Sequence, residues 1–340
     1  MTSPNDLPAT MRAVTIATPG GPDGLLPVDY PLPLPKAGEV LIRVGAAGVN
    51  GPDLAQRRGQ YDPPPGASPL PGLEVAGIVV AQGENAAKHA IGARVMALTN
   101  GGGYAEYVAV PEGQVLPMPV GWRFTEAAAL PETWFTITQT LVMRAGVEPG
   151  MSVLVHGASG GIGGAAIQIA GILGAKAIGV VSSREKAAYA KKLGAFATVD
   201  RSADIATEVL ALTGGKGVDR IVDLIGGEMA AVNVEASARF GHIVLIATLD
   251  GGTAPVPLRQ IMAKNLTLSG STLRPQTSAT KADIAARIAH DLLPALQSPD
   301  WIKPEIAVFP LEAAAEAHRA MEGRSHIGKL VLQTRFGAAE

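Results

Sequence analysis

A glycine-rich turn in the middle of the chain, residues 157–164, constrains the fold more than any other feature. A short apolar run, 152–155, precedes this turn, and an Ala- and Ile-rich segment that favours a helix follows it directly. Glycines let the backbone approach a pyrophosphate, and the following helix offers it unpaired N–H groups and the positive end of its dipole. The order of strand, turn and helix therefore predicts a dinucleotide-binding site, formed by Gly157, Ser159, Gly160, Gly161, Ile162 and Gly163.

Composition limits the class of protein. A length of 340 residues suggests about two domains, and 47% apolar with 17% charged residues is typical of a globular chain with large cores. The net charge of −2, without a block of like charge, argues against binding to nucleic acid or to an anionic membrane surface. The absence of cysteine excludes disulfides and thiolate metal ligands. Because neither a secretion signal nor an apolar run of about 18 residues is found, we expect a cytoplasmic protein.

The first third of the chain reads as short strands that clusters of Pro and Gly separate. Strands are predicted at 39–44, 73–80, 94–98 and 104–110. The proline-rich segment 61–66 is predicted to be a loop, because prolines fix φ and remove backbone donors.

From residue 125 onward helices and strands alternate, which predicts a parallel sheet with helices on both faces. The C-terminal segment is too short to fold alone, so we expect it to return to the β-rich part. The predicted fold is α/β, with a discontinuous β-rich domain, 1–127 and 276–340, and an inserted doubly wound domain, 128–275. The expected elements are a helical region 125–145 with a break at Pro131, helices 184–193, 204–212, 229–238, 280–296 and 311–322, and strands 175–181, 218–224, 242–247, 266–271 and 328–333.

The end of the second strand of the doubly wound domain indicates which nicotinamide cofactor binds. A site for NAD places an acidic residue there, whereas this chain has Ser182, Ser183, Arg184 and Lys186, and Arg201 follows the next strand. Hydroxyls and cations suit a 2′-phosphate, so NADPH is favoured over NADH. Alternatively, Ser182 and Glu185 form a capping box for the next helix, and both roles are compatible.

Several further motifs occur in a characteristic order and spacing: GVNGPDL at 48–54, RGQYDPPPG at 58–66, PGLEVAG at 71–77, GYAEYV at 103–108, STLR at 271–274 and IGKLVL at 327–332. With them, the chain resembles the zinc-free medium-chain dehydrogenase/reductase superfamily, and within it the zeta-crystallin-like quinone oxidoreductases. The resemblance implies a GroES-like catalytic domain, a Rossmann domain that binds NADPH, and a homodimer joined along the strand edge 266–272.

Zinc-dependent relatives carry a Gly-His-Glu signature, whereas this chain reads Gly72-Leu73-Glu74 and lacks the histidine. The resemblance therefore implies no metal, and Glu74 is interpreted as structural, either partly buried or at a sheet edge. The six histidines show no pair at metal-ligand spacing. His318 is expected to be solvated, and His156 to lie in the core.

The resemblance implies three substrate-side residues, each with an alternative role. Asn50 could donate to a carbonyl oxygen or cap the short helix that starts near Pro52. Tyr61 could bind or stack on a quinone, or pack on the neighbouring prolines. Thr136 could lie near the nicotinamide or be a buried helix hydroxyl. The resemblance also implies cofactor contacts from Ser182, Lys186, Arg201, Ala247, Thr248, Leu249, Leu273 and Lys329.

The function expected from this resemblance is NADPH-dependent, metal-free reduction of quinones by hydride transfer in the interdomain cleft. A first alternative is an NADPH-dependent reductase of double bonds in enals, enones or enoyl thioesters. A second is a nucleotide-sensing or RNA-binding protein with little catalysis. The expected partners are a small quinone or conjugated carbonyl and a second copy of the chain.

Overall fold

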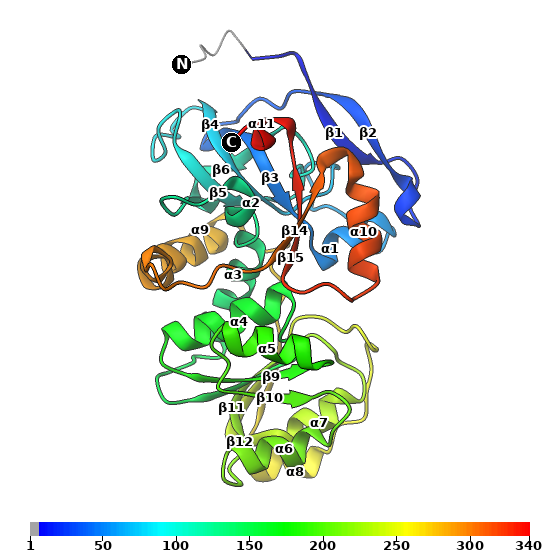
Figure 1. The fold of residues 1–340 in the computed structure, drawn as a ribbon, viewed down its shortest axis with the longest axis vertical. Coiled ribbons are helices and arrows are strands. Elements are labelled where there is room, and N and C mark those ends of the chain that lie inside the picture. The colour runs from blue at the N-terminus through cyan, green and yellow to red at the C-terminus, as the bar shows by residue number, and fades with distance from the viewer. Residues whose placement is uncertain (1–6) are drawn as a thin grey trace. The chain divides into compact units, whose positions relative to one another are not determined.

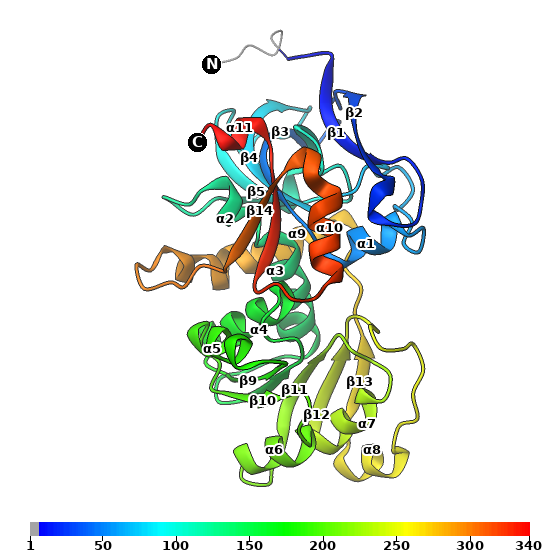
Figure 2. The ribbon, with the colours of Figure 1, turned by 45° about the vertical axis from the view of Figure 1, so that its right-hand side comes forward.

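The computed structural model describes residues 7–340. The chain divides into two compact units (Figures 1 and 2). Unit 1 combines Met1–Phe135 with Arg274–Glu340, and unit 2 is Thr136–Leu273. The sequence analysis places the corresponding boundaries after residues 127 and 275. Within residues 7–340, no helix is both long and apolar enough to cross a bilayer.

Unit 1 is built on a seven-stranded sheet with the order β14-β15-β3-β4-β5-β7, and β6 pairs with β3. A separate antiparallel pair is formed by β1 and β2. The strands are β1 (Thr10–Ile16), β2 (Leu25–Pro31), β3 (Glu39–Gly48), β4 (Glu74–Gln82), β5 (Arg94–Leu98), β6 (Tyr107–Pro111), β7 (Val115–Pro117), β14 (Ile306–Pro310) and β15 (Lys329–Gln333). The helices are α1 (Gly51–Arg57), α2 (Phe124–Ala127), α3 (Pro131–Ile137, which spans the unit boundary), α9 (Ser278–Arg287), α10 (Ala314–Glu322) and α11 (Arg335–Ala338).

The C-terminal segment completes the sheet of unit 1, which confirms the predicted discontinuous domain. Strand β15 pairs antiparallel with β3, so that Leu332 lies opposite Ala47. Leu330 and Leu332 are buried in the same apolar cluster as Val44 and Val75. Strand β15 has only five residues and cannot form a stable sheet alone. Burial of its apolar side chains against β3 therefore stabilises the C-terminal segment within unit 1.

Unit 2 contains a six-stranded sheet with the order β10-β9-β8-β11-β12-β13, in which every pair is parallel. Counted along the chain this is the order 3-2-1-4-5-6 of a dinucleotide-binding fold, as the alternation of elements predicts. The strands are β8 (Ser152–Val155), β9 (Lys176–Val181), β10 (Ala197–Asp200), β11 (Val218–Asp223), β12 (Ser237–Leu245) and β13 (Thr267–Gly270). The helices are α4 (Gly161–Ile172), α5 (Arg184–Lys192), α6 (Ile205–Leu212), α7 (Met229–Ala236) and α8 (Leu258–Lys264).

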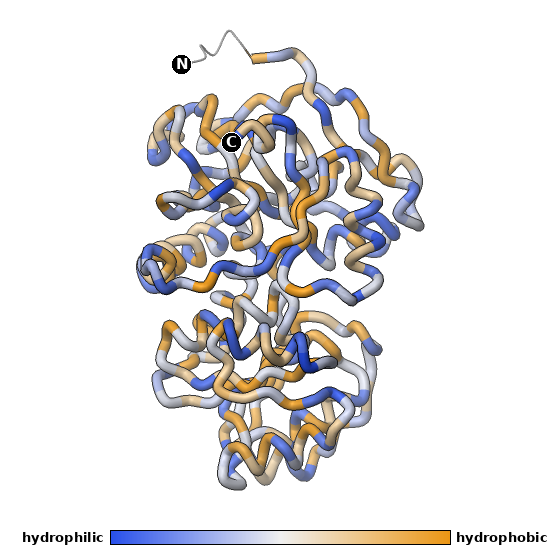
Figure 3. The backbone as a smooth tube through the Cα atoms, viewed as in Figure 1, coloured by the Kyte–Doolittle hydropathy of each residue, from blue (hydrophilic) through white to orange (hydrophobic). Residues whose placement is uncertain are grey.

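Helices cover both faces of the sheet of unit 2. Figures 1 and 2 show α4 and α5 on one face and α6, α7 and α8 on the other. The strands are therefore apolar, and Val153, Leu154 and Val155 of β8 are fully buried. In Figure 3 hydrophilic residues occur mainly on the helices and turns around the sheet. Asp204 caps α6, since its carboxylate accepts a hydrogen bond from the Thr207 N–H at 3.1 Å, so this helix begins where the predicted helix 204–212 does.

The sequence analysis missed several elements. Strands β1, β2, β7 and β14 were not predicted, and prolines within β2 and β14 weaken the strand signal. Helix α8 was not predicted because it is only seven residues long, and its apolar residues Leu258, Ile261 and Met262 are too few to give a clear helical period. Strand β12 begins at Ser237 instead of residue 242, and its pairing with β11 shifts register between Val218 and Arg220.

The helical region predicted at 125–145 is divided into three parts. Helices α2 and α3 are followed by a wider, π-helical segment, Thr138–Arg144. Pro131 begins α3, a position at which the missing proline N–H would have had no helical partner. The predicted helix 280–296 likewise keeps α geometry only as far as Arg287.

Candidate functional site

The glycine turn of unit 2 connects β8 to α4, and two of its glycines are required by the backbone: Gly163 by a close contact and Gly157 by its positive φ. A Cβ on Gly163 would lie 2.3 Å from the Gly157 carbonyl oxygen and 2.5 Å from the Ala158 Cα. Gly157 has a φ of 62°, which side chains disfavour, and Gly160 caps α4. Ser159, Gly161 and Ile162 complete the turn. The first turn of α4 thus presents backbone N–H groups beside a surface without side chains, and this cradle fits a pyrophosphate.

Hydroxyls and cations lie at the end of β9, next to this turn. The Ser183 hydroxyl accepts the Lys186 backbone N–H at 3.2 Å and caps α5. The alternative capping box on Ser182 is therefore wrong, because Ser182 lies one residue before the cap. Its hydroxyl instead accepts a hydrogen bond from the Lys186 ammonium at 3.3 Å. Ser182 and Arg184 are exposed.

Arg201 lies beside this group although it follows a different strand. Its backbone N–H donates to the Val181 carbonyl at 2.8 Å, and its side chain is exposed. Because β9 and β10 are parallel, their carboxyl ends lie at the same edge of the sheet. No acidic residue stands at the last position of β9, where a site for NAD would place one. These side chains fit a 2′-phosphate.

The other cofactor residues expected in unit 2 follow the remaining strands. Ala247, Thr248 and Leu249 come after β12, and the Leu249 N–H donates to the Leu224 carbonyl at 3.3 Å. Leu273 comes after β13, and Thr136 lies in α3. All strands of the sheet are parallel, so the residues after β8, β9, β10, β12 and β13 gather at one edge.

A buried polar chain supports the loops at this edge. His156 Nε2 lies 2.7 Å from the Asn233 Oδ1, and the Asn233 amide donates to Asp223 at 3.0 Å. Asp223 also accepts the backbone N–H groups of Ile225 and Gly226. Burial lowers the pKa of His156, which favours the neutral ring as donor to the amide oxygen. The expectation of a core role for His156 is confirmed.

The polar side chains of unit 1 meet around Asn50, between β3 and α1. The Lys329 ammonium donates to the Asn50 Oδ1 at 2.6 Å and to the Glu74 carboxylate at 2.5 Å. The Asn50 amide donates to the same carboxylate at 2.8 Å. Asn50 occupies the N-cap position, but its side chain makes no hydrogen bond to the helix; Asp53 instead accepts the Asn50 N–H at 2.8 Å. The orientation of the Asn50 amide is therefore fixed by Lys329 and Glu74.

Glu74 is fully buried, so the expectation of a partly buried or sheet-edge carboxylate is wrong. Its second oxygen accepts the Glu132 backbone N–H at 2.8 Å. Burial raises the pKa of the Glu132 carboxyl to about 8, and the Glu74 carboxylate adds to this effect. Burial also raises the pKa of Asp53 to about 6, against hydrogen bonds from Gly72 and Asn50 that lower it. Unit 1 thus contains a cluster of buried ionisable side chains, namely Asp53, Glu74, Glu132 and Lys329.

Tyr61 lies in the predicted loop between α1 and β4. The guanidinium of Arg274 lies over its ring, 5.3 Å from the centroid. Burial raises the pKa of the Tyr61 phenol, and the Glu132 carboxylate adds to the shift. The phenol is thus kept in its protonated form, in which it can donate a hydrogen bond.

His318 is completely buried, which contradicts the expectation of a solvated residue. Its Nε2 lies 3.0 Å from the Tyr104 hydroxyl, and its Nδ1 lies 3.4 Å from Arg57 Nη1. Burial lowers the pKa of His318 to about 3, and the positive charge of Arg57 lowers it further. The amphipathic pattern of α10 did not reveal this contact, because the partners lie far away in the sequence.

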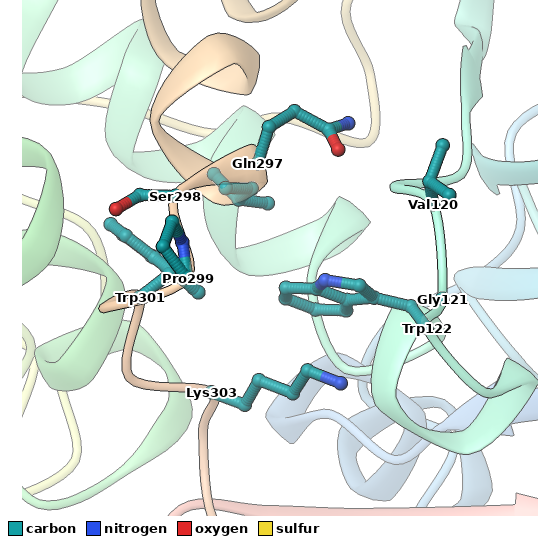
Figure 4. Close-up of a pocket in the computed structure, with 9 residues that line it drawn as sticks. Val120, Gly121, Trp122, Gln297, Ser298, Pro299, Trp301 and Lys303 are labelled. Atoms are coloured by element: carbon teal, nitrogen blue, oxygen red, sulfur yellow. The ribbon is translucent and has the colours of Figure 1, made fainter.

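A small pocket of about 220 Å³ lies elsewhere in unit 1 (Figure 4). Its walls include Trp122, Trp301 and Lys303. The Lys303 ammonium lies over the Trp122 ring at 5.0 Å and forms an ion pair with Glu126. None of the residues that the sequence analysis selected lines this pocket.

Comparison with known proteins agrees with this geometry. Residues 36–120 match the alcohol dehydrogenase GroES-like domain, and residues 161–288 match the family model named zinc-binding dehydrogenase. The human quinone oxidoreductase is 35% identical over 95% of this chain and 97% of its own length. The chain belongs to the zeta-crystallin-like quinone oxidoreductase family.

Solved structures of this superfamily cover nearly the whole chain. A mycobacterial protein solved as a complex with NADPH is 31% identical, with a TM-score of 0.84 over 95% of this chain and all of that one. An enoyl reductase is 26% identical, with a TM-score of 0.83 over 95% of this chain and 99% of that one. The GroES-like and Rossmann folds of this oxidoreductase family are therefore both present here.

The name of the second family model implies zinc, and the donor set of this chain does not fit it. The chain has no cysteine. The Glu74 carboxylate forms an ion pair with the Lys329 ammonium, and this positive charge would repel a zinc ion at the same carboxylate. Among residues 7–340 there is no group of three or more His, Asp or Glu side chains arranged to hold a metal ion.

Some buried groups of unit 1 were not selected from the sequence, namely Asp53, Glu132, Arg274 and Lys281. A signal existed for Glu132, because a carboxylate stands there within the mostly apolar segment 127–137. Arg274 lies within the STLR motif, but its burial depends on Asn100 and Tyr61 and could not be inferred from the motif.

Proposed function

We propose that this member of the family reduces quinones with NADPH and needs no metal ion. The observation that carries the proposal is the contact of Asn50 with Glu74 and Lys329. It places a buried ammonium on the carboxylate and fixes a neutral amide as hydrogen-bond donor. The names of the human relative and of the NADPH-bound mycobacterial structure support it.

Unit 2 is proposed to bind the cofactor. Backbone N–H groups of the glycine turn would hold the pyrophosphate, and Ser182, Lys186 and Arg201 would hold the 2′-phosphate. When bound, NADPH supplies the hydride. Leu273 and Ala247, Thr248 and Leu249 are proposed as further contacts. The role of Lys329 as a cofactor contact remains a prediction, and its ammonium already has Glu74, Asn50 and the Val49 carbonyl as partners.

Unit 1 is proposed to recognise the substrate. An amide NH₂ has two hydrogens, and Glu74 accepts one from Asn50, which leaves the other for a substrate oxygen. Such a donor stabilises negative charge that develops on that oxygen. Tyr61 is proposed as a second donor or as a stacking surface. Thr136 belongs to unit 2 and is proposed to lie near the nicotinamide. The quinol monoanion that hydride addition leaves would take one proton from water.

The alternative function is reduction of conjugated carbon–carbon double bonds. It is favoured by the structural similarity to an enoyl reductase. In that reaction the Asn50 amide would stabilise an enolate oxygen.

A homodimer is proposed through the edge strand β13. The strand is last in the sheet of unit 2, and such an edge tends to pair. Leu258, Met262 and Leu268 near this edge are exposed by 66, 76 and 37%. Sedimentation of the wild type against Leu268→Lys tests the assembly, and a monomeric wild type would contradict it.

The test of function is a set of initial rates of NADPH and NADH oxidation with an ortho-quinone, a para-quinone and a simple enone. Fast NADPH turnover on either quinone supports the proposal. Turnover of the enone alone would transfer support to the double-bond reductase, and equal rates with both cofactors would contradict the assignment of the 2′-phosphate site.

A further inference from the structure

Arg274 carries a buried guanidinium that the contacts of unit 1 leave only partly bonded. Its relative exposure is 6%. Its Nη2 donates to the Asn100 carbonyl at 3.1 Å, while Nε and Nη1 have no partner. Buried charged groups are normally paired or fully hydrogen-bonded, because an unpaired one is costly. Two unused donors on a buried cation therefore point to a ligand that is absent from the isolated chain.

The backbone of Arg274 is held in place by a second buried cation. The Lys281 ammonium donates to the Arg274 carbonyl at 2.8 Å and to the Asn100 side-chain oxygen at 2.5 Å. Lys281 is 1% exposed. These contacts immobilise the backbone of Arg274 and the residue that accepts from it. The free donors are thus preorganised, which reduces the entropy lost when a ligand binds.

No carboxylate compensates these charges directly. Among the ion pairs of residues 7–340, none includes Arg274 or Lys281. Asp53 lies near enough to act on Arg274 electrostatically, but its oxygens accept the N–H groups of Gly72 and Asn50. Burial raises the pKa of Glu132 to about 8, so this neighbour is largely uncharged at neutral pH.

The position of the guanidinium connects it with the proposed substrate residues. It lies over the ring of Tyr61, 5.3 Å from the centroid. A cation over an aromatic face gains attraction from the ring quadrupole but gives up none of its N–H donors. Tyr61 and Arg274 therefore form one polar surface.

We propose that Arg274 binds a negatively charged oxygen of the substrate, as a specificity-determining residue of the proposed quinone reductase. The inference rests on the proposed function for the nature of the substrate. The charge could be permanent, on an acidic substituent of the quinone ring. It could also develop during reduction, when hydride addition oxidises NADPH to NADP⁺ and leaves a quinol monoanion that then takes a proton from water. Arginine remains protonated in both cases.

The test compares naphthoquinone with naphthoquinone sulfonate in steady-state kinetics of the wild type, Arg274→Gln and Arg274→Lys. The matched control is Arg43→Gln, because Arg43 also stacks on an aromatic ring, that of Phe336 at 4.2 Å, and has no proposed role. We expect Arg274→Gln to lower kcat/KM about ten- to hundredfold, as for the loss of a hydrogen bond to a charged group. Arg274→Lys should recover part of this loss.

The two sources of charge give different patterns. A lower kcat on both quinones assigns Arg274 to the developing charge, whereas a higher KM confined to the sulfonate assigns it to a permanent anion. Unchanged kinetics on both quinones would overturn the proposal. So would an NADPH dissociation constant that rises in Arg274→Gln while the quinone constants stay the same, because the charge would then serve the cofactor.

A calorimetric titration with naphthoquinone sulfonate separates this proposal from the proposed function. If the wild type reduces neither quinone, the proposed function fails. Tighter sulfonate binding by the wild type than by Arg274→Gln would still support the anion contact, and equal binding would refute it. Thermal unfolding of each variant, compared with that of Arg43→Gln, shows whether a loss of activity or binding reflects misfolding. If Arg274→Gln is misfolded, the calorimetric titration of Arg274→Lys, which keeps the positive charge, decides the question.

Discussion

In unit 2 the proposed nucleotide site consists of backbone groups and partly exposed side chains at the ends of parallel strands. In unit 1 the proposed substrate donor Asn50 is instead held by the buried charges of Glu74 and Lys329. The glycine turn lies within eight consecutive positions, 157–164. Lys329 and Asn50 are separated by 279 positions and still form a hydrogen bond of 2.6 Å. The difference teaches that a backbone cradle is a local property, whereas a cluster of buried charges depends on how distant segments pack.

The largest effect is expected when Lys329 is removed from its buried ion pair with Glu74. Lys329→Met should lower the free energy of unfolding by about 3–5 kcal/mol, because the buried Glu74 carboxylate loses its counter-ion. Denaturant unfolding measures this effect. In the double variant Glu74→Gln/Lys329→Met the loss should be smaller than the sum of the two single losses, and strict additivity would show that the pair is not coupled.

A second prediction concerns the exposed cations of unit 2. Lys186→Glu combined with Arg201→Glu should weaken NADPH binding about a hundredfold and NADH binding much less, because only NADPH carries the 2′-phosphate. Fluorescence titration with each nucleotide gives the two dissociation constants. An equal loss for both nucleotides would mean that these side chains are merely solvated surface charges.

The glycine turn can be tested with a pair of matched variants in α4. Gly163→Ala should destabilise the protein by about 1–3 kcal/mol and weaken nucleotide binding, because its Cβ would lie 2.3 Å from the Gly157 oxygen. Gly171→Ala, in the same helix, meets nothing within 4 Å and should stabilise by about 0.5–1 kcal/mol. Similar unfolding midpoints for the two variants would contradict a tightly packed turn.

The last prediction concerns a gradual pH dependence of stability from Glu132. Its folded-state pKa of about 8 lies above the ordinary value of 4.5, so between these pH values the folded protein binds more protons than the unfolded one. Its stabilising contribution is therefore present below pH 4.5 and is lost as pH rises towards 8, by at most about 1.4 kcal/mol per pH unit. Glu132→Gln should flatten this slope in urea titrations at several pH values. An unchanged slope would assign the pH dependence to other groups.

The sequence predicts features that depend on neighbouring residues better than features that depend on contacts between distant segments. The alternation of elements predicts the parallel sheet, and the glycine spacing predicts the turn between β8 and α4, because both rest on local backbone preferences. His318 was expected in solvent and is buried, since contacts with Tyr104 and Arg57 outweigh its position on a polar-looking helix. Glu74 was expected at an edge or partly buried, and Lys329, 255 positions away, is what permits its full burial.

The sequence by itself determined the two-part α/β architecture and the glycine turn of unit 2, because strand and helix periodicity and the need for a missing Cβ act over a few residues. It also determined which residue types stand at the end of β9. Only the tertiary structure decided that Asn50, Glu74, Glu132, Arg274 and Lys329 share the interior of one unit. The physical reason is that the free energy of a buried charge depends on its partners, and those partners come from segments far apart in the chain, such as β15, which brings Lys329 to Glu74 by pairing with β3.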